Sequence, residues 1–162
     1  MNIATRLAGA ALAAAACSQV YAQKTAEHRV VHVATDDKAM HAAIQRAQAT
    51  LPAFLVLAAN PAAGTGDYRL KVAISDPNGT EHFWVAPFKI VRGGFRGVLS
   101  NTPQIVRNVK LGQVIDFKRT QISDWGYTRN GRQVGSFTVC VMMTQVPKAE
   151  ADGYRREYGF DC

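Results

Sequence analysis

The chain has 162 residues, and it carries 19 Lys and Arg against 12 Asp and Glu, a net charge of +7. This length suits one domain with a core of its own. The positive charge is compatible with acidic partners such as anionic lipid, a cell-wall polymer or an acidic protein, but a solvated basic surface is the preferred interpretation. No run of Lys or Arg is longer than two residues, which argues against nucleic acid as the partner.

The first 22 residues are typical of a secretory signal peptide. Arg6 supplies the positive charge, Leu7 to Ala16 form a short apolar run, and Val20-Tyr21-Ala22 suit a signal peptidase. The pattern predicts cleavage before Gln23 and export of a single domain over residues 23–162. The apolar run is about half the roughly 20 residues that span a bilayer, so we expect a periplasmic or secreted protein with no transmembrane segment.

A lipid anchor is the alternative for this N-terminal region. The segment Ala14-Ala15-Ala16-Cys17 resembles a bacterial lipobox, in which Cys17 would be lipidated after cleavage. Ala14 stands where a lipobox usually has Leu or Val, so soluble export is the preferred interpretation.

Cleavage before Gln23 leaves two cysteines, Cys140 and Cys162. Because an exported protein meets an oxidising compartment, we predict a disulfide between them that pins the C-terminal tail to the domain. Two unpaired thiols are the alternative.

Helical patterns dominate the first part of the mature chain. A short strand is expected over Arg29 to Ala34, and Asp36-Asp37 can cap the helix that follows. That helix has an apolar stripe at helical spacing: Ala39, Met40, Ala43, Ile44, Ala47 and Leu51. Pro52 suits a first helical turn, so the pattern predicts a second helix over Ala53 to Ala59.

Strand patterns follow from Tyr68 onward. Asp76-Pro77-Asn78-Gly79 and Asn130-Gly131 predict tight turns, and Pro87 indicates an edge or a bulge. The expected strands are Tyr68 to Ser75, Thr80 to Val91, Phe95 to Leu99, Val114 to Phe117, Ile122 to Thr128 and Gln133 to Thr144. The tail from Pro147 predicts a short helix ending near Gly159. We therefore expect an α+β fold, with N-terminal helices packed on a strongly bent antiparallel sheet or a small, partly open barrel.

Several blocks of sequence resemble the bacterial YegJ-like family, domain of unknown function class 2314. These blocks are Gly79 to Val85, Val106 to Gln113, Ile122 to Trp125, Gly135 to Thr138 and Glu157 to Gly159. The resemblance covers the chain from about Asp36 to its end and implies a shared fold. Members occur as small exported or lipid-anchored proteins and as domains of larger ones, which implies a binding module rather than one fixed chemistry.

Six residues form the candidate binding site. A carboxylate, an imidazole and aromatic rings in one cleft bind polar ligands or perform acid–base chemistry. The six residues are Glu81, His82, Trp84, Arg107, Asp124 and Trp125. The structural interpretation is preferred over this site: Asp124 binds backbone N–H groups, Trp125 fills the core and Glu81 pairs with Arg107.

The sequence offers no motif for a metal, a cofactor or a catalytic nucleophile. His28 and His32 share one face of the first expected strand, but no paired Cys motif or His-Glu-x-x-His segment accompanies them. We therefore expect a non-catalytic exported protein that binds a protein or a cell-wall component, such as an inhibitor or immunity-type partner of an envelope-acting toxin. The alternative is a small envelope hydrolase that acts on cell-wall material through Glu81, His82 and Asp124.

Overall fold

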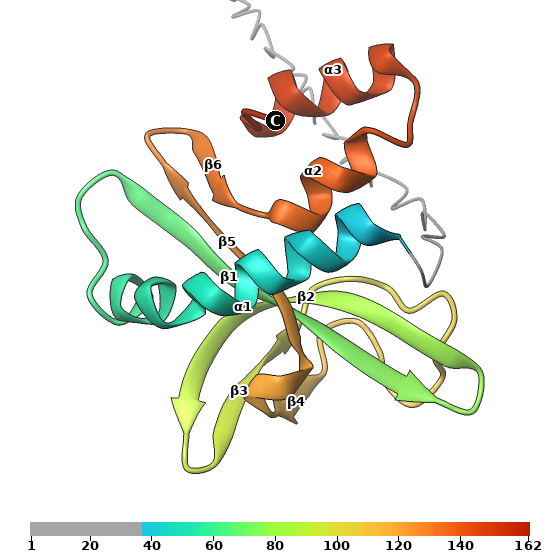
Figure 1. The fold of residues 1–162 in the computed structure, drawn as a ribbon. Helices are drawn as coiled ribbons and strands as arrows, with labels where there is room; N and C mark the ends of the chain where they lie inside the picture. The colour runs from blue at the N-terminus through green and yellow to red at the C-terminus, as the bar shows by residue number, and fades with distance from the viewer. Residues whose placement is uncertain (1–36) are drawn as a thin grey trace, which may run out of the picture.

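The computed structural model describes residues 37–162 (Figure 1). The expected signal peptide, the lipidation alternative at Cys17, the strand over Arg29 to Ala34 and the histidines of the weighed metal site, His28 and His32, lie outside the described residues.

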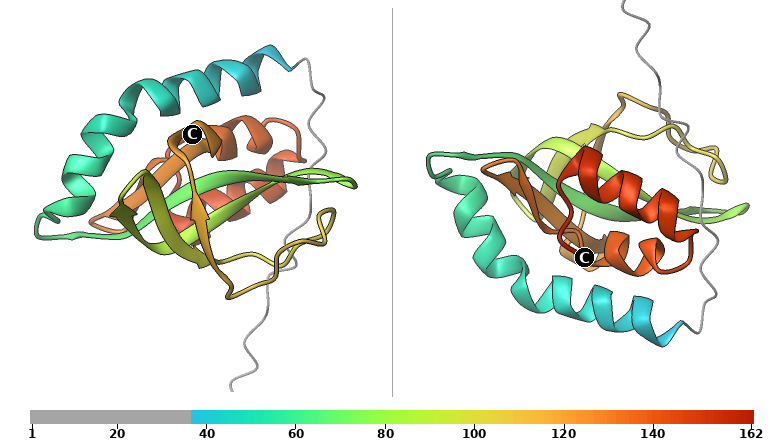
Figure 2. Two further views of the ribbon diagram at one scale, coloured as in Figure 1. Left: turned by 90° about the horizontal axis from the view of Figure 1, so that it is seen from below. Right: turned by 90° about the horizontal axis from the view of Figure 1, so that it is seen from above.

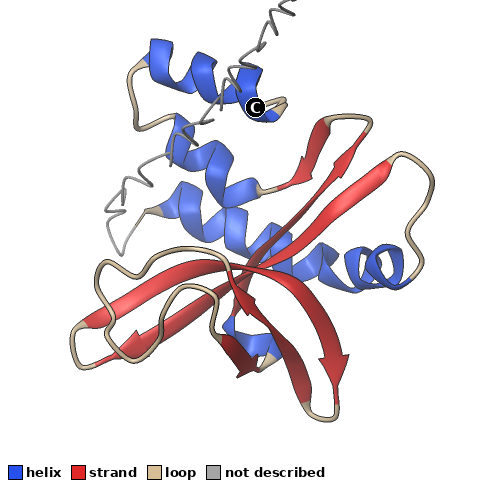
Figure 3. Ribbon diagram, turned by 180° about the vertical axis from the view of Figure 1, so that it is seen from behind, coloured by secondary structure: helices blue, strands red, loops and turns tan. Residues whose placement is uncertain are grey.

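Six antiparallel strands form one open sheet with the order β4-β3-β2-β1-β5-β6. The strands are strongly bent, as Figure 3 shows, and the predicted α+β class is confirmed. The sheet does not close into a barrel. Its strands are β1 Thr65–Asp76, β2 Gly79–Val91, β3 Gly94–Leu99, β4 Val114–Phe117, β5 Ile122–Arg129 and β6 Arg132–Gly135, with a 3₁₀ turn, η1, at Arg119–Gln121.

Local turn chemistry sets the hairpins as predicted. Asp76 pairs with Gly79 across the first turn, and Asn130-Gly131 joins β5 to β6 with positive φ angles of 48° and 76°. Both angles suit the tight turn that Asn-Gly favours. The pairing of β2 with β3 shifts in register between Val85 and Phe88, so the bulge expected at Pro87 is confirmed.

One long helix, α1 (Lys38–Ala59), replaces the two helices expected on either side of Pro52. Asp37 caps its start, because Oδ1 accepts hydrogen bonds from the backbone N–H groups of Ala39 and Met40. Pro52 removes one helical hydrogen bond, and the helix is visibly curved in Figure 2. It continues because Leu51 and Phe54, on either side of Pro52, are both buried.

The face of α1 that carries Ala43, Ala47, Leu51 and Phe54 is buried. The helix is long and apolar enough, with a mean hydropathy of 1.2, to qualify as a membrane span by length and composition. Core helices of soluble proteins meet the same criteria. Here Phe54 stacks on Trp125 of β5, with ring centroids 4.8 Å apart, and both belong to the core that the sheet forms with the helix.

The segment Gln133 to Thr144, expected to be one strand, divides into β6 and a short helix, α2 (Phe137–Met143). Gly135 and Ser136 both have positive φ angles, 80° and 53°, which end the strand. The carboxylate of Asp124 in β5 then accepts the first N–H groups of α2, so the helix is capped from another part of the chain. The predicted C-terminal helix is confirmed as α3 (Lys148–Tyr158), which ends at Gly159 with φ of 73°.

Candidate functional site

Glu81 and His82 lie on opposite faces of the sheet because neighbouring side chains in a strand alternate. Glu81 accepts hydrogen bonds from the backbone N–H groups of Gln104 (3.0 Å) and Ile105 (2.9 Å). It therefore anchors the loop between β3 and β4. Arg107, in the same loop, has an exposed side chain, and its backbone N–H donates to Asp76 at 2.6 Å. No Glu81–Arg107 ion pair forms among residues 37–162.

Asp124 is completely buried at the start of α2. Its carboxylate accepts hydrogen bonds from the backbone N–H groups of Trp125 (2.8 Å) and Thr138 (2.8 Å), from the hydroxyl of Thr138 (2.7 Å), and from the N–H of Phe137 (3.2 Å). Burial raises the pKa of Asp124, while the donors from Thr138 and the charge of Lys71 oppose that rise. This carboxylate is occupied by the fold and has no exposed surface on which to meet a substrate.

Trp125 points to the other face, into the core under α1. Its indole Nε1–H donates to the carbonyl of Ala47 at 3.0 Å, and its ring meets Phe137 edge-on. The residue is 7% exposed. Trp125 therefore joins the sheet to α1 and α2.

A buried lysine that the sequence analysis did not single out completes the Asp124 network. Lys71 Nζ lies 3.0 Å from the hydroxyl oxygen of Thr138, and that hydroxyl in turn donates to Asp124. Burial lowers the pKa of Lys71, and the nearby charge of Asp124 opposes the shift. Lys71, Thr138 and Asp124 thus tie β1, α2 and β5 together through polar contacts.

The face of the sheet opposite the core also carries a partly open surface, which we call the Trp84 face. It comprises Arg69, Lys71, His82 and Trp84. Lys71 pairs directly with Trp84 across β1 and β2. Arg69 Cζ lies 4.8 Å and Lys71 Nζ 5.6 Å from the Trp84 ring centroid, both within cation–π range. Trp84 and Arg69 are half-buried and His82 is exposed, so the two cations hold an aromatic ring at the surface.

His82 reaches across β1 to Ser123 of β5. Its Nδ1 lies 2.8 Å from Ser123 Oγ, and the intervening residue on β1, Ala73, is small. Partial burial of the ring, together with the charge of Lys71, lowers the pKa of His82. A Ser–His contact is the nucleophile–base pair of many hydrolases, but Ser123 is 5% exposed and its hydroxyl also donates to the carbonyl of Lys71. Asp124, which could orient the imidazole of such a site, makes its hydrogen bonds elsewhere.

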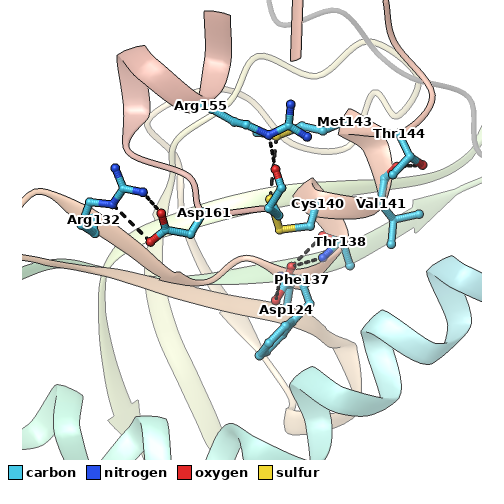
Figure 4. Close-up of a disulfide and its surroundings, with 11 residues drawn as sticks. Asp124, Arg132, Phe137, Thr138, Cys140, Val141, Met143, Thr144, Arg155 and Asp161 are labelled. Atoms are coloured by element: carbon cyan, nitrogen blue, oxygen red, sulfur yellow. Dashed lines mark hydrogen bonds and ion pairs between the residues drawn. A yellow bond between two sulfur atoms is a disulfide. The ribbon is translucent and has the colours of Figure 1, made fainter. Parts of the chain in front are cut away.

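The C-terminal tail is fastened to the domain as predicted. The sulfur atoms of Cys140 and Cys162 lie at disulfide distance, with 5.5 Å between the Cα atoms (Figure 4). Cys140 belongs to α2 and not to the strand that the sequence suggested. Arg155 donates to the carbonyl of Cys162, and Arg132 pairs with Asp161, so polar contacts hold the tail beside the disulfide.

The structure therefore separates the six candidate residues into four groups. Glu81 and Asp124 hold backbone N–H groups, Trp125 is core, and Arg107 lies in the β3–β4 loop. His82 and Trp84 come together with two residues that sequence reasoning missed, Arg69 and Lys71. The sequence contains the signal that could have identified them. Arg69 and Lys71 alternate with the apolar Leu70 and Val72, and this alternation places them on the face opposite the core. Among the residues described, no group of three or more His, Cys, Asp and Glu is placed to hold a metal ion.

Comparison with known proteins identifies the family. A family model described as "Uncharacterized protein conserved in bacteria (DUF2314)" matches residues 37–162. The chain is 38% identical over 120 residues to "Uncharacterized protein YegJ" of Escherichia coli (strain K12), which covers 74% of this chain and 77% of that one. It is also 31% identical over 81 residues to a putative ankyrin repeat protein of Neisseria meningitidis serogroup B, covering 50% of this chain and only 32% of the relative. No solved structure matches the chain. The chain is a member of the DUF2314 family of proteins conserved in bacteria.

Proposed function

We propose that this protein is an exported, non-catalytic binding protein of the bacterial envelope, and that the Trp84 face contacts its partner. The observation that carries the proposal is that the fold occupies the two carboxylates but leaves the Trp84 ring accessible to a partner. Glu81 and Asp124 are engaged by backbone N–H groups on opposite faces, while Trp84 stays half-exposed beside Arg69. Half-exposed Trp and Arg are the residue types that most often dominate binding energy at protein interfaces.

The partner class that we favour is a protein, such as an envelope-acting toxin that this chain inhibits as an immunity-type partner. A half-exposed aromatic ring beside the guanidinium of Arg69 suits a protein surface that presents carboxylates around an apolar contact. A cell-wall component with carboxylate groups is the alternative partner with the same chemistry.

Export rests on residues 1–22, whose pattern is that of a cleaved signal peptide. The mass of the protein recovered from the periplasm tests it. A chain that begins at Gln23 supports export in soluble form. A mass increased by lipid on Cys17 would replace soluble export with membrane anchoring, and a full-length chain confined to the cytoplasm would refute export.

Photocrosslinking in living cells tests the binding surface. A photoreactive amino acid replaces the exposed His82, and in a matched control it replaces the exposed His41 on α1. A discrete adduct from position 82 that is absent from position 41, and that disappears when Arg69→Glu is added, supports the Trp84 face. Equal labelling from both positions, or an adduct that persists with Arg69→Glu, contradicts it.

A hydrolase acting on cell-wall material remains the second candidate, and the His82–Ser123 contact of 2.8 Å is the observation that favours it. Its test is the release of soluble fragments from purified cell-wall sacculi. Release by the wild type that Ser123→Ala and His82→Ala both abolish would establish the enzyme. We expect no release from any of the three.

A further inference from the structure

The net positive charge of the described part of the chain lies in one stretch of sequence along the β4 edge of the sheet. Residues 86–121, here called the basic lobe, comprise the end of β2, then β3, β4, η1 and the loops between them. They contain one acidic residue, Asp116, and seven exposed basic residues: Lys89, Arg92, Arg96, Arg107, Lys110, Lys118 and Arg119. Residues 37–85 and 122–162 together contain nine basic and nine acidic residues, so they add no net charge.

Large apolar side chains are exposed in the same lobe. Ile90 is 60% exposed, Leu111 56% and Val114 59%. Ile90 lies in the β2–β3 hairpin between the exposed Lys89 and Arg92. Apolar surface that is bordered by charged residues marks an interaction site, and the charged residues on either side of Ile90 are basic.

An apolar groove continues from Ile90 toward the end of α1. It has a volume of about 420 Å³ and is lined mainly by Leu55 and Ala58 of α1, Tyr68 of β1, and Phe88 and Ile90 of β2, with Lys89 at its edge. Val56 and Leu57, in the last turns of the same helix, are 65% and 36% exposed. Apolar surface and the basic side chain of Lys89 therefore meet beside the β2–β3 hairpin.

We propose that the basic lobe docks on an anionic phospholipid bilayer. Ile90 and the apolar groove enter the headgroup region, and Lys89 and Arg92 approach the lipid phosphates. Apolar side chains bordered by Lys and Arg bind such an interface through buried apolar area and attraction to anionic lipid together. The inference rests on the proposed function, namely that the chain acts by binding. The lipid-binding region that it proposes is separate from Arg69 and His82, which would contact the protein partner.

Cosedimentation of the purified protein with vesicles tests this inference. Vesicles of phosphatidylglycerol and phosphatidylcholine are compared with vesicles of phosphatidylcholine alone. We expect binding only to the first, with affinity that falls as salt rises, because the screening length shrinks from about 10 Å at 0.1 M to about 3 Å at 1 M ionic strength. Equal binding to both vesicles, or no binding to either, overturns the inference.

Charge reversal locates the contact. Lys89→Glu with Arg92→Glu is expected to weaken binding to the anionic vesicles at least about 25-fold, since one basic residue near such a surface contributes a factor of about five. Lys148→Glu with Arg156→Glu is the matched control. It changes the net charge equally on the exposed surface of α3, which lies at the far end of the molecule from β3 and β4 in Figure 1. Equal weakening by both double variants would show general charge attraction and would overturn the assignment to the basic lobe.

An apolar substitution separates a bilayer from a soluble polyanion. Ile90→Ser is expected to weaken vesicle binding several-fold and to leave binding to soluble polyphosphate unchanged, because only the bilayer buries the side chain. Tyr158→Ser, a change at a 37% exposed residue of α3, should affect neither. If Ile90→Ser leaves vesicle binding unchanged, the ligand is a polyanion and not a membrane. The vesicle assays test the lipid-binding inference, and photocrosslinking at position 82 tests the proposed binding function. The two results are independent, so either proposal can fail without the other.

Discussion

Replacing Asp124 with Ala is expected to destabilise the fold more than any surface change. The carboxylate is fully buried, and four hydrogen-bond donors point at it from Trp125, Phe137 and Thr138. The substitution leaves these donors without an acceptor in a buried site. It also leaves the buried Lys71 without its nearby opposite charge.

The expected loss follows from these contacts. A buried donor without a partner costs about 1–3 kcal/mol, and removal of one member of a buried charge pair costs about 3–5 kcal/mol. The terms overlap because Thr138 connects Lys71 to Asp124, so we expect a loss of about 3–5 kcal/mol rather than their sum. A small domain has a free energy of unfolding of about 5–15 kcal/mol, so the variant should retain only part of its stability.

Urea unfolding followed by tryptophan fluorescence measures the free energy of unfolding. Asp116→Ala is the matched control, because Asp116 pairs with Arg96 while both side chains are about half exposed, 60% and 49%, and such pairs contribute about 0–1 kcal/mol. The double variant Lys71→Met/Asp124→Ala should lose less than the sum of the two single losses, because no buried charge remains unpaired. A loss of less than about 1 kcal/mol for Asp124→Ala would refute the role assigned to this carboxylate.

Three further predictions follow from the described contacts. Cys140→Ser and Cys162→Ser should each lower the free energy of unfolding by about 3 kcal/mol, and the double variant should show no further loss. Thiol titration that finds two free thiols in the unfolded, unreduced protein would contradict the disulfide. Because the folded pKa of His82 is lowered, its contribution to stability is present above the unfolded pKa of about 6.5 and is lost as pH falls through the folded value. NMR titration of its ring should give a pKa below that of the urea-unfolded chain, and an equal or higher value would be inconsistent with the burial of the ring beside the charge of Lys71. Trp125→Ala should cost about 3–5 kcal/mol and the half-exposed Trp84→Ala clearly less, as thermal unfolding will show; the reverse order would exchange their assigned roles.

The hairpins of the sheet were predictable because their signals are local. Leu70, Val72 and Ile74 alternate along β1, and all three are buried. The turn residues then set where each strand ends, through the φ angles that Asn130 and Gly131 accept. Patterns of this kind depend only on a few consecutive residues, so one sequence is sufficient to identify them.

The two wrong element assignments depended on contacts distant in sequence. Pro52 would normally start or break a helix, but the burial of Leu51 and Phe54 keeps α1 continuous. Residues 137–143 have strand-like composition, yet the Asp124 carboxylate from β5 caps them as a helix. Neither effect is visible in the local pattern.

The candidate site was predicted only in part for the same reason. His82 and Trp84 occupy alternate positions of one strand, so their shared face follows from period-two spacing. Their contacts with Ser123 and Arg69 come from other strands, and they depend on the register of β1 with β2 and β5. Glu81 was grouped with His82 because they are adjacent in sequence, although adjacency in a strand places them on opposite faces.

The equilibrium affinity for the partner crosslinked at position 82 is the most direct test of the binding function. Calorimetry with the purified partner should show a stable complex that Trp84→Ala weakens at least about 30-fold, since an aromatic residue at an interface hot spot contributes about 2 kcal/mol or more. The same titration should leave the partner chemically intact. An affinity unchanged by Trp84→Ala, or a partner cleaved during the measurement, would contradict a non-catalytic binding protein that acts through the Trp84 face.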